Sequence, residues 1–180
     1  EHLLIPLGGR DIYLLPRLGA SAFPLFDADA AGLPTGQPVL DAKLSKDGAI
    51  CGFVCANEVY TCRVGTSTAH EVTQVTSGAR GEELSHGMAD FLAQEEMDRY
   101  DGFWISPDNA LLAFEQVDER DVVQYTIPHY VDDPTAKEDH RYPFAGAANP
   151  KVRLGVVQIG GVSVSDKRVV WLHLFESGAD

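Results

Sequence analysis

The stretch SKDGAICGF, from Ser45 to Phe53, aligns without a gap on SPDNALLAF, from Ser106 to Phe114, with Ser, Asp, Ala and Phe at matching places. Each copy begins with a tight-turn signal, in which Asp is followed by Gly or Asn, and continues into a short apolar run. Such a run is typical of a strand that is buried on both faces of its sheet. The offset of 61 residues between the copies is therefore the strongest indication of architecture in the chain.

A second similarity supports the repeat. Asp11-Ile12-Tyr13 matches Glu58-Val59-Tyr60 at a spacing of 47 residues. Partial repeats of this length, made of short strands and tight turns, are typical of a β-propeller, in which each blade is a four-stranded sheet that stacks on its neighbours. The sequence therefore predicts an all-β fold of about three to four consecutive blades or parts of blades.

The rest of the chain fits the same scheme. Segments rich in Val, Leu and Ile predict further strands at Asp121 to Ile127, Val152 to Ile159 and Arg168 to Phe175. Two segments rich in small or polar residues, Gly19 to Pro38 and Asp132 to Asp139, predict loops between strands. We therefore expect short strands and connecting loops along most of the sequence.

One segment, SHGMADFLAQEEMDRY from Ser85 to Tyr100, has a helical pattern and accounts for the longer of the two repeat offsets. Asp90 is a suitable N-cap residue. Met88, Phe91 and Leu92 have the three-and-four spacing of one apolar helix face. The segment therefore predicts a short helical insertion between copies of the repeat.

The insertion carries two adjacent acids, Glu95 and Glu96, where the apolar face would otherwise continue. Two carboxylates near a helix end can converge on one small cation, and an ammonium group suits them because it has three donors and no acceptor. The alternative is a surface ion pair, since Glu95 and Arg99 stand four residues apart in the favourable order for a helix. Spacing leaves both interpretations open.

The chain of 180 residues is acidic, because 14 Lys and Arg stand against 27 Asp and Glu for a net charge of -13. A phosphate backbone or an anionic membrane would need the opposite sign, so nucleic acid and membrane are not expected partners, whereas a cationic ligand meets a favourable field. No apolar run approaches the roughly 20 residues that span a bilayer. The first residues lack the basic and apolar regions of a signal peptide, and the compartment stays open between cytoplasm and periplasm.

The three cysteines, Cys51, Cys55 and Cys62, lie close together in sequence. Four residues of extended strand would separate Cys51 from Cys55 by roughly 13 Å, and a disulfide needs Cα atoms within about 7 Å. This pair is therefore expected to stay unbridged and to pack as small hydrophobic side chains. No Cys or His spacing resembles a zinc site, and we expect neither a metal nor another cofactor.

The segment ADFLAQEEMDRYDGFWISPDNALLAFEQVDE, Ala89 to Glu119, resembles the part of the dipeptidyl peptidase IV group, within the prolyl oligopeptidase family, that carries paired glutamates. The run RYPFAGAANPKVRLGVV, Arg141 to Val157, resembles that group's Tyr-Pro-x-Ala-Gly-x-x-Asn-Pro stretch. The resemblance implies an eight-bladed propeller that caps an α/β-hydrolase domain. It also implies that Glu95 and Glu96 grip the free amino terminus of a peptide, so that cleavage falls after the second residue, commonly Pro or Ala.

The catalytic residues of that family are not expected in this chain, because it contains no Gly-x-Ser-x-Gly elbow, and the family's substrate-orienting arginine has no assigned counterpart. Residues 1–180 are thus interpreted as a fragment of the N-terminal propeller. The expected partners are a peptide with a free amino terminus and the hydrolase domain of the same polypeptide, and exposed blade edges would favour a homo-oligomer. The alternative is a non-catalytic propeller that serves only binding or protein interaction.

Overall fold

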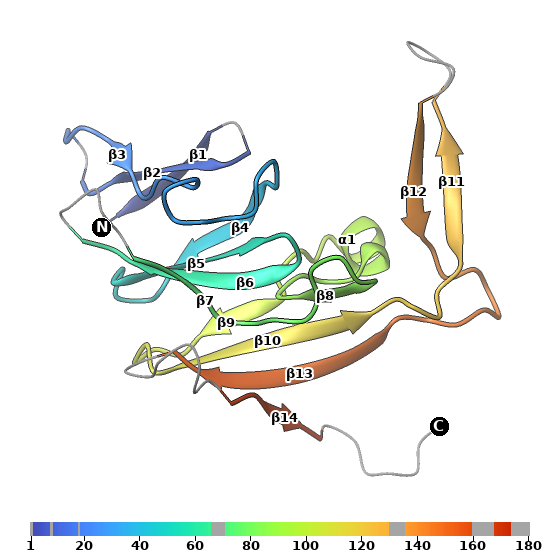
Figure 1. The fold of residues 1–180 in the computed structure, drawn as a ribbon. Helices are drawn as coiled ribbons and strands as arrows, with labels where there is room; N and C mark the ends of the chain where they lie inside the picture. Colours follow the sequence, from blue (N-terminus) through green and yellow to red (C-terminus); the bar gives the residue numbers. More distant parts are fainter. Residues whose placement is uncertain are drawn as a thin grey trace.

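The computed structural model describes residues 2–7, 9–17, 19–65, 71–129, 136–159 and 168–173. Within these ranges, strands make up most of the regular structure and one short helix interrupts them (Figure 1). The helix is too short to cross a membrane, and no other helix of the described part could do so. The prediction of an all-β fold with a short helical insertion is confirmed.

Two antiparallel sheets form the N-terminal half of the chain. The first has the strand order β1–β2–β3 and the second the order β4–β5–β6–β7. Their bounds are Leu3–Leu7 (β1), Asp11–Leu15 (β2), Phe23–Pro24 (β3), Val39–Leu44 (β4), Ile50–Cys55 (β5), Glu58–Arg63 (β6) and Val72–Gln74 (β7). The second sheet is an up-and-down meander of four strands, which is the form of a propeller blade.

A third sheet lies against the second (Figure 1) and has the order β14–β13–β10–β8, with β9 also paired to β10. Its strands are Leu84–His86 (β8), Phe103–Ile105 (β9), Leu111–Asp118 (β10), Lys151–Gln158 (β13) and Val170–Leu172 (β14). β8 and β9 lie end to end along one edge of β10, since β8 pairs with residues 116–118 and β9 with residues 112–114. Between them the chain leaves the sheet, forms helix α1 (Phe91–Met97) and returns.

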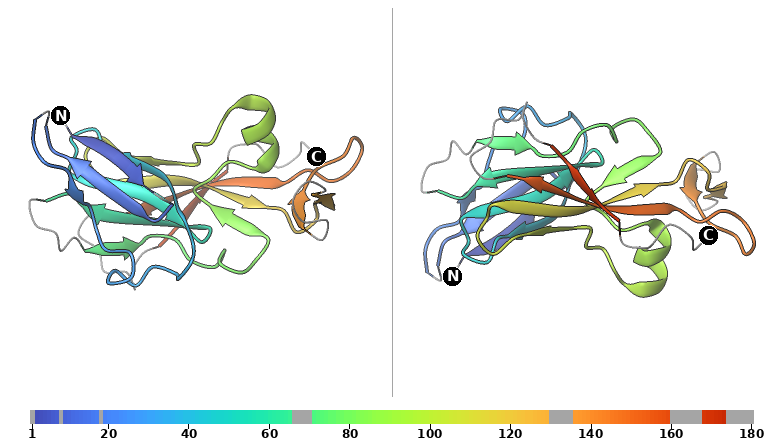
Figure 2. Two further views of the ribbon diagram at one scale, coloured as in Figure 1. Left: turned by 90° about the horizontal axis from the view of Figure 1, so that it is seen from above. Right: turned by 90° about the horizontal axis from the view of Figure 1, so that it is seen from below.

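A hairpin of two strands, β11 (Gln124–Pro128) and β12 (Lys137–Arg141), projects away from the end of β10 (Figures 1 and 2). The strand predicted at Asp121 to Ile127 is confirmed but begins at Gln124. The loop predicted at Asp132 to Asp139 is wrong in its last three residues, which pair with β11, while residues 132–135 lie outside the described ranges. A polar segment can form this strand because most of it faces solvent on both sides, so no apolar alternation marks it in the sequence.

The other predicted elements agree more closely. The strand predicted at Val152 to Ile159 is β13, displaced by one residue. The strand predicted at Arg168 to Phe175 is the shorter β14, and residues 174 and 175 lie outside the described ranges. The loop predicted at Gly19 to Pro38 contains only the two-residue strand β3 among its described residues.

The two copies of the main repeat form the same hydrogen-bonded turn. Asp47 and Asp108 each accept a hydrogen bond from the hydroxyl of the Ser two residues earlier (2.8 and 2.5 Å) and from the backbone N–H two residues later (3.0 and 3.1 Å). The turns also touch, because the Asn109 side chain donates to Asp47 at 2.8 Å, the largest of the contacts that lower the pKa of Asp47 to about 2. The turns connect β4 to β5 and β9 to β10, so the copies occupy equivalent places in successive blades.

The shorter similarity also corresponds to equivalent places. Ile12 and Val59 are the second residues of β2 and β6. The carbonyl of each accepts a hydrogen bond of 2.7 Å from the residue that follows the next strand, Leu25 or Val75. The first and second sheets therefore repeat the same pairing of two successive strands.

The core consists of two layers of side chains on either side of the second sheet. All six residues of β5 are buried. Phe53 stacks between Phe26 and Tyr60 on the side of the first sheet, with ring centroids 4.9 and 5.6 Å away, whereas Val54 packs in the cluster shared with the third sheet. Full burial of such side chains stabilises the fold by about 1.5–3 kcal/mol each. Cys51, Cys55 and Cys62 are free, buried thiols, as predicted.

Gly87 lies where the chain leaves β8, against the second sheet. Its φ of +81° is left-handed, and a Cβ there would lie 2.4 Å from Cγ2 of Val59 and 3.2 Å from Cγ2 of Val54. Only glycine combines this backbone conformation with so close an approach of the neighbouring strands. The segment from Gly87 to Gly102, which leaves the third sheet between β8 and β9 and carries α1, is hereafter the α1 excursion. Its start is therefore fixed against the second sheet.

We expect Gly87→Ala to lower the free energy of unfolding by about 2–4 kcal/mol, because it adds overpacking to left-handed strain. Gly146→Ala is the matched control, since Gly146 has the same φ of +81° but its added methyl group would meet no atom within 4 Å. The control should cost only about 1 kcal/mol. Urea denaturation measures both, and equal losses would contradict the close packing at Gly87.

Candidate functional site

Helix α1 carries the predicted acidic pair and has well-defined ends. At its start, Oδ1 of Asp90 accepts a hydrogen bond from the Ala93 N–H at 3.1 Å, so the predicted N-cap is confirmed. At its end, Asp98 adopts a left-handed conformation with φ 51°, and the Arg99 N–H donates back to the Ala93 carbonyl at 3.1 Å. The helix is therefore shorter than the predicted segment from Ser85 to Tyr100.

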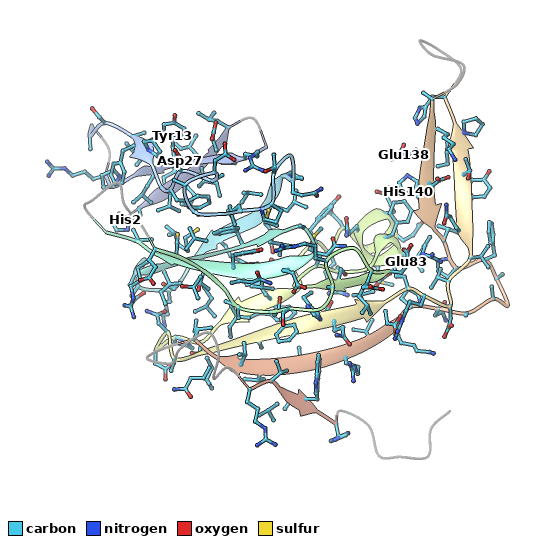
Figure 3. The ribbon with its side chains drawn as sticks, viewed as in Figure 1. His2, Tyr13, Asp27, Glu83, Glu138 and His140 are labelled. Atoms are coloured by element: carbon cyan, nitrogen blue, oxygen red, sulfur yellow. The ribbon has the colours of Figure 1, made fainter. Side chains whose placement is uncertain are left out.

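The apolar side of α1 packs against the base of the hairpin. Phe91 stacks on His140 with ring centroids 4.7 Å apart and meets the edge of Tyr142 at 6.4 Å. Figure 3 shows His140 and Glu83 beside α1 at this end of the hairpin. Ala93 is the buried residue of the helix. These contacts fix which side of α1 turns towards solvent.

Glu95 and Glu96 lie on the exposed side of α1. Within the described residues, neither carboxylate forms an ion pair with a Lys or Arg side chain. The surface pair between Glu95 and Arg99 that the spacing allowed is not formed. Nη1 of Arg99 instead lies 2.9 Å from both carboxylate oxygens of Glu115 on β10, because the left-handed residue Asp98 turns the chain away from the helix face.

The returning leg of the excursion is tied to the second sheet by Lys43 of β4. Nζ of Lys43 lies 2.5 Å from Asp101 and 2.8 Å from Asp41, and it sits 4.1 Å above the Phe103 ring. Asp41 has a left-handed φ of 47° at an irregularity in the pairing of β4 with β5. Burial raises the pKa of its carboxyl, although Lys43 acts in the opposite direction.

The first part of the excursion is held to the second sheet by a chain of buried hydrogen bonds that starts at Glu58 of β6. Nδ1 of His86 lies 2.8 Å from Glu58, and Nε2 of His86 lies 2.7 Å from the side-chain amide nitrogen of Gln116. Nε and Nη2 of Arg153 both donate to the Gln116 side-chain oxygen. Because Arg153 can only donate, the Gln116 nitrogen must donate to His86, and His86 must therefore donate to Glu58 through Nδ1.

Glu58 is fully buried yet remains ionised. Its carboxylate accepts hydrogen bonds from the Thr76 hydroxyl at 2.6 Å and from the backbone N–H groups of Ala79 and Arg80 at 2.6 and 3.2 Å, besides the contact with His86. Burial would raise the pKa of Glu58, but these donors, His86 first among them, lower it overall. The carboxylate is thus a fixed anchor between the second and third sheets.

A cavity of about 290 Å³ opens between α1, β8 and β12. Its lining includes several acids and one arginine: Glu82, Glu83, Asp90, Glu119 and Arg141. Burial is the main cause that raises the pKa of Glu119, whereas Arg141 lies 2.7 Å from Glu83 and lowers the pKa of that group. Glu95 and Glu96 are not among the residues that line this cavity.

The anchors of the excursion were not predicted from the sequence. Glu58, Lys43 and Glu115 find partners at least 16 residues away, which spacing alone does not indicate. A charged residue inside an apolar strand was the available signal, since Glu115 interrupts LLAFEQVD. Among the described residues, no group of three His, Cys, Asp or Glu side chains is arranged to hold a metal ion.

Residues 22–180 match the family described as the dipeptidyl peptidase IV (DPP IV) N-terminal region. The chain belongs to this family. Its relatives include the probable dipeptidyl peptidase 4 of Emericella nidulans, which is 34% identical over 132 residues, covering 69% of this chain and 16% of that protein. Dipeptidyl peptidase 8 of Mus musculus is 28% identical over 136 residues, covering 66% of this chain and 15% of that protein.

The fold has a counterpart among solved structures. The Porphyromonas gingivalis dipeptidyl peptidase 4 structure superposes with a TM-score of 0.67 at 23% sequence identity, covering 95% of this chain and 23% of that chain. This similarity supports the fold of a DPP IV N-terminal propeller region. The chain spans about a sixth of the length of the curated relatives it matches.

In this DPP IV N-terminal region, we expect Glu58→Gln to lower the free energy of unfolding by about 3 kcal/mol at neutral pH, because a buried site built for a carboxylate keeps unpaired donors. The folded state lowers the pKa of Glu58 from its ordinary 4.5, so its stabilisation is complete above that value and is lost as pH falls below it. Urea unfolding from pH 7 into this acid range measures both effects.

Glu71→Gln is the matched control, because Glu71 is an exposed acid. It should change stability by less than about 0.5 kcal/mol. The Glu58→Gln variant should also lose less stability than the unsubstituted chain on acidification. If the Glu58→Gln variant and the unsubstituted chain lost the same stability on acidification, Glu58 would be ruled out as the ionised anchor.

Proposed function

We propose that this chain is the substrate-binding part of a serine dipeptidyl peptidase, in which Glu95 and Glu96 bind the amino terminus of a peptide. The observation that carries the proposal is the exposure of two adjacent carboxylates on one helix, without an ion-pair partner among the described residues. Membership of the DPP IV N-terminal family and relatives named as dipeptidyl peptidases support it.

The chemistry of the pair fits a protonated amine. A peptide amino terminus has a pKa of about 7.7–8.0 and carries a positive charge over most of the neutral range. Its three N–H donors match the acceptor oxygens of two carboxylates, which themselves donate nothing when ionised. Two neighbouring negative charges also repel each other, so an ammonium group between them relieves repulsion as well as forming hydrogen bonds.

A fixed grip on the amine would determine where the peptide is cut. If α1 holds the first residue at one place, a nucleophile at a constant distance reaches the bond after the second residue, commonly one that follows Pro or Ala. The nucleophile and its partners would belong to an α/β-hydrolase domain of the same polypeptide, because this chain has no Gly-x-Ser-x-Gly elbow. The chain then contributes binding and positioning.

In the protein that carries both domains, we expect Glu95→Ala or Glu96→Ala to raise KM for an unblocked chromogenic dipeptide substrate by about tenfold or more, since each removes charge-assisted hydrogen bonds. An N-acetylated substrate should be cleaved poorly by every variant, because its amine carries no charge. Steady-state kinetics with the substrate pair measures both expectations.

Glu71→Ala supplies the control, because it removes an equally exposed acid that is not on α1. It should leave KM unchanged. Unchanged kinetics in both Glu95 and Glu96 variants would refute the amine clamp, and equal cleavage of blocked and unblocked peptides would refute the dipeptidase proposal. A protein that binds peptides without releasing dipeptides would favour a non-catalytic binding propeller instead.

A further inference from the structure

Glu115 is the point on β10 at which both ends of the α1 excursion are attached. Its carbonyl accepts a hydrogen bond of 2.9 Å from the N–H of Gly87, where the chain leaves the sheet. Its N–H donates at 2.8 Å to the carbonyl of Gly102, where the chain returns. Between these attachments the neck of the excursion is closed by a single bridge between Met88 and Asp101. Glu115 is therefore hydrogen-bonded to both legs of the excursion that carries Glu95 and Glu96.

The side chain of Glu115 also engages the cation closest in sequence to the acidic pair. Nη1 of Arg99 lies 2.9 Å from each Glu115 carboxylate oxygen and donates to the Asp101 carbonyl at 3.1 Å. The Glu115 side chain is 15% exposed and the Arg99 side chain 39% exposed, so the contact is shielded on the carboxylate side. An arginine stays charged at every accessible pH, and Glu115 is the carboxylate that Arg99 contacts.

The second cation beside the excursion is engaged in the same way. Lys43 is shared between Asp41 and Asp101, and its ammonium lies over the Phe103 ring. Both cations that hold the returning leg are thus paired with acids other than Glu95 and Glu96. The arrangement leaves the acidic pair available for a cation from outside the chain.

We propose that Glu115 is a positioning residue whose carboxylate keeps Arg99 away from Glu95 and Glu96, so that the amine of the substrate does not compete with an internal guanidinium. This inference rests on the proposed function. Arg99 follows α1 directly after the left-handed residue Asp98, so a guanidinium released from Glu115 is the cation of this chain nearest in sequence to the acidic pair. Glu115 then acts on binding through Arg99 and touches no substrate atom.

The test uses the protein that carries both domains and three variants: Glu115→Gln, Arg99→Gln and the two combined. In Glu115→Gln, the freed Arg99 should raise KM for an unblocked dipeptide substrate by about two- to fivefold, the range that an exposed ion pair can supply, with kcat nearly unchanged. Arg99→Gln alone should leave KM within about twofold of the starting protein. The combined variant should recover a KM near that of Arg99→Gln, because no competing cation remains.

Two results would overturn the proposal. If Arg99→Gln raises KM as much as Glu115→Gln and the combined variant shows no recovery, the pair only shapes the loop. If Glu115→Gln leaves KM unchanged while Glu95→Ala raises it, Glu115 has no positioning role although the amine clamp stands. An unchanged KM in Glu95→Ala and Glu96→Ala would instead refute the clamp itself. Recovery of activity in the combined variant also shows that Glu115→Gln does not act by unfolding.

Discussion

The burial of the middle sheet on both faces is the constraint on which the rest of the structure depends. β5 has no exposed residue, because the first sheet covers one face and the third sheet covers the other. A blade cannot cover its own faces, so each sheet is stable only against its neighbours. Polar side chains that lie within the stacked sheets, such as Glu58 and Gln116, consequently need hydrogen-bond partners there. Glu58 is buried between two sheets only because four donors surround it.

The position of the acidic pair depends on this stacking of sheets, because the α1 excursion that carries Glu95 and Glu96 is held against the second sheet. His86 and Gly87 press its first leg against β6, and Lys43 of β4 holds its second leg through Asp101. All three contacts join the excursion to the second sheet. The position of α1 is therefore a property of how two sheets stack, and a change in that stacking would move the helix without altering any residue on it.

The features that could be predicted from the sequence are those that depend on hydrogen bonds between residues close together in the chain. The Ser-x-Asp turn and the Asp90 cap each satisfy their hydrogen bonds within a few residues, so the sequence contained the necessary information. The partner of Arg99 depends on a left-handed Asp98, which no glycine or asparagine signals, and the pair with Glu95 that the spacing left open is not formed. β12 was missed because both of its faces meet solvent over most of its length. Contacts such as Glu58 with His86 join distant segments and leave no periodic trace.

The charge balance of the chain determines how strongly an unpaired acid indicates a binding site. With 27 Asp and Glu against 14 Lys and Arg, many carboxylates must lack a cation whatever the fold. An isolated exposed acid is therefore ordinary, and a cation that meets one gains about 0–1 kcal/mol at most. What distinguishes Glu95 and Glu96 is that they are adjacent, that a capped and packed helix holds them, and that the nearest arginine in sequence is bound elsewhere. A cation arriving there meets two neighbouring acids at once, and this adjacency on a packed helix, more than the lack of partners, is the reason to propose the pair as a site for an amine.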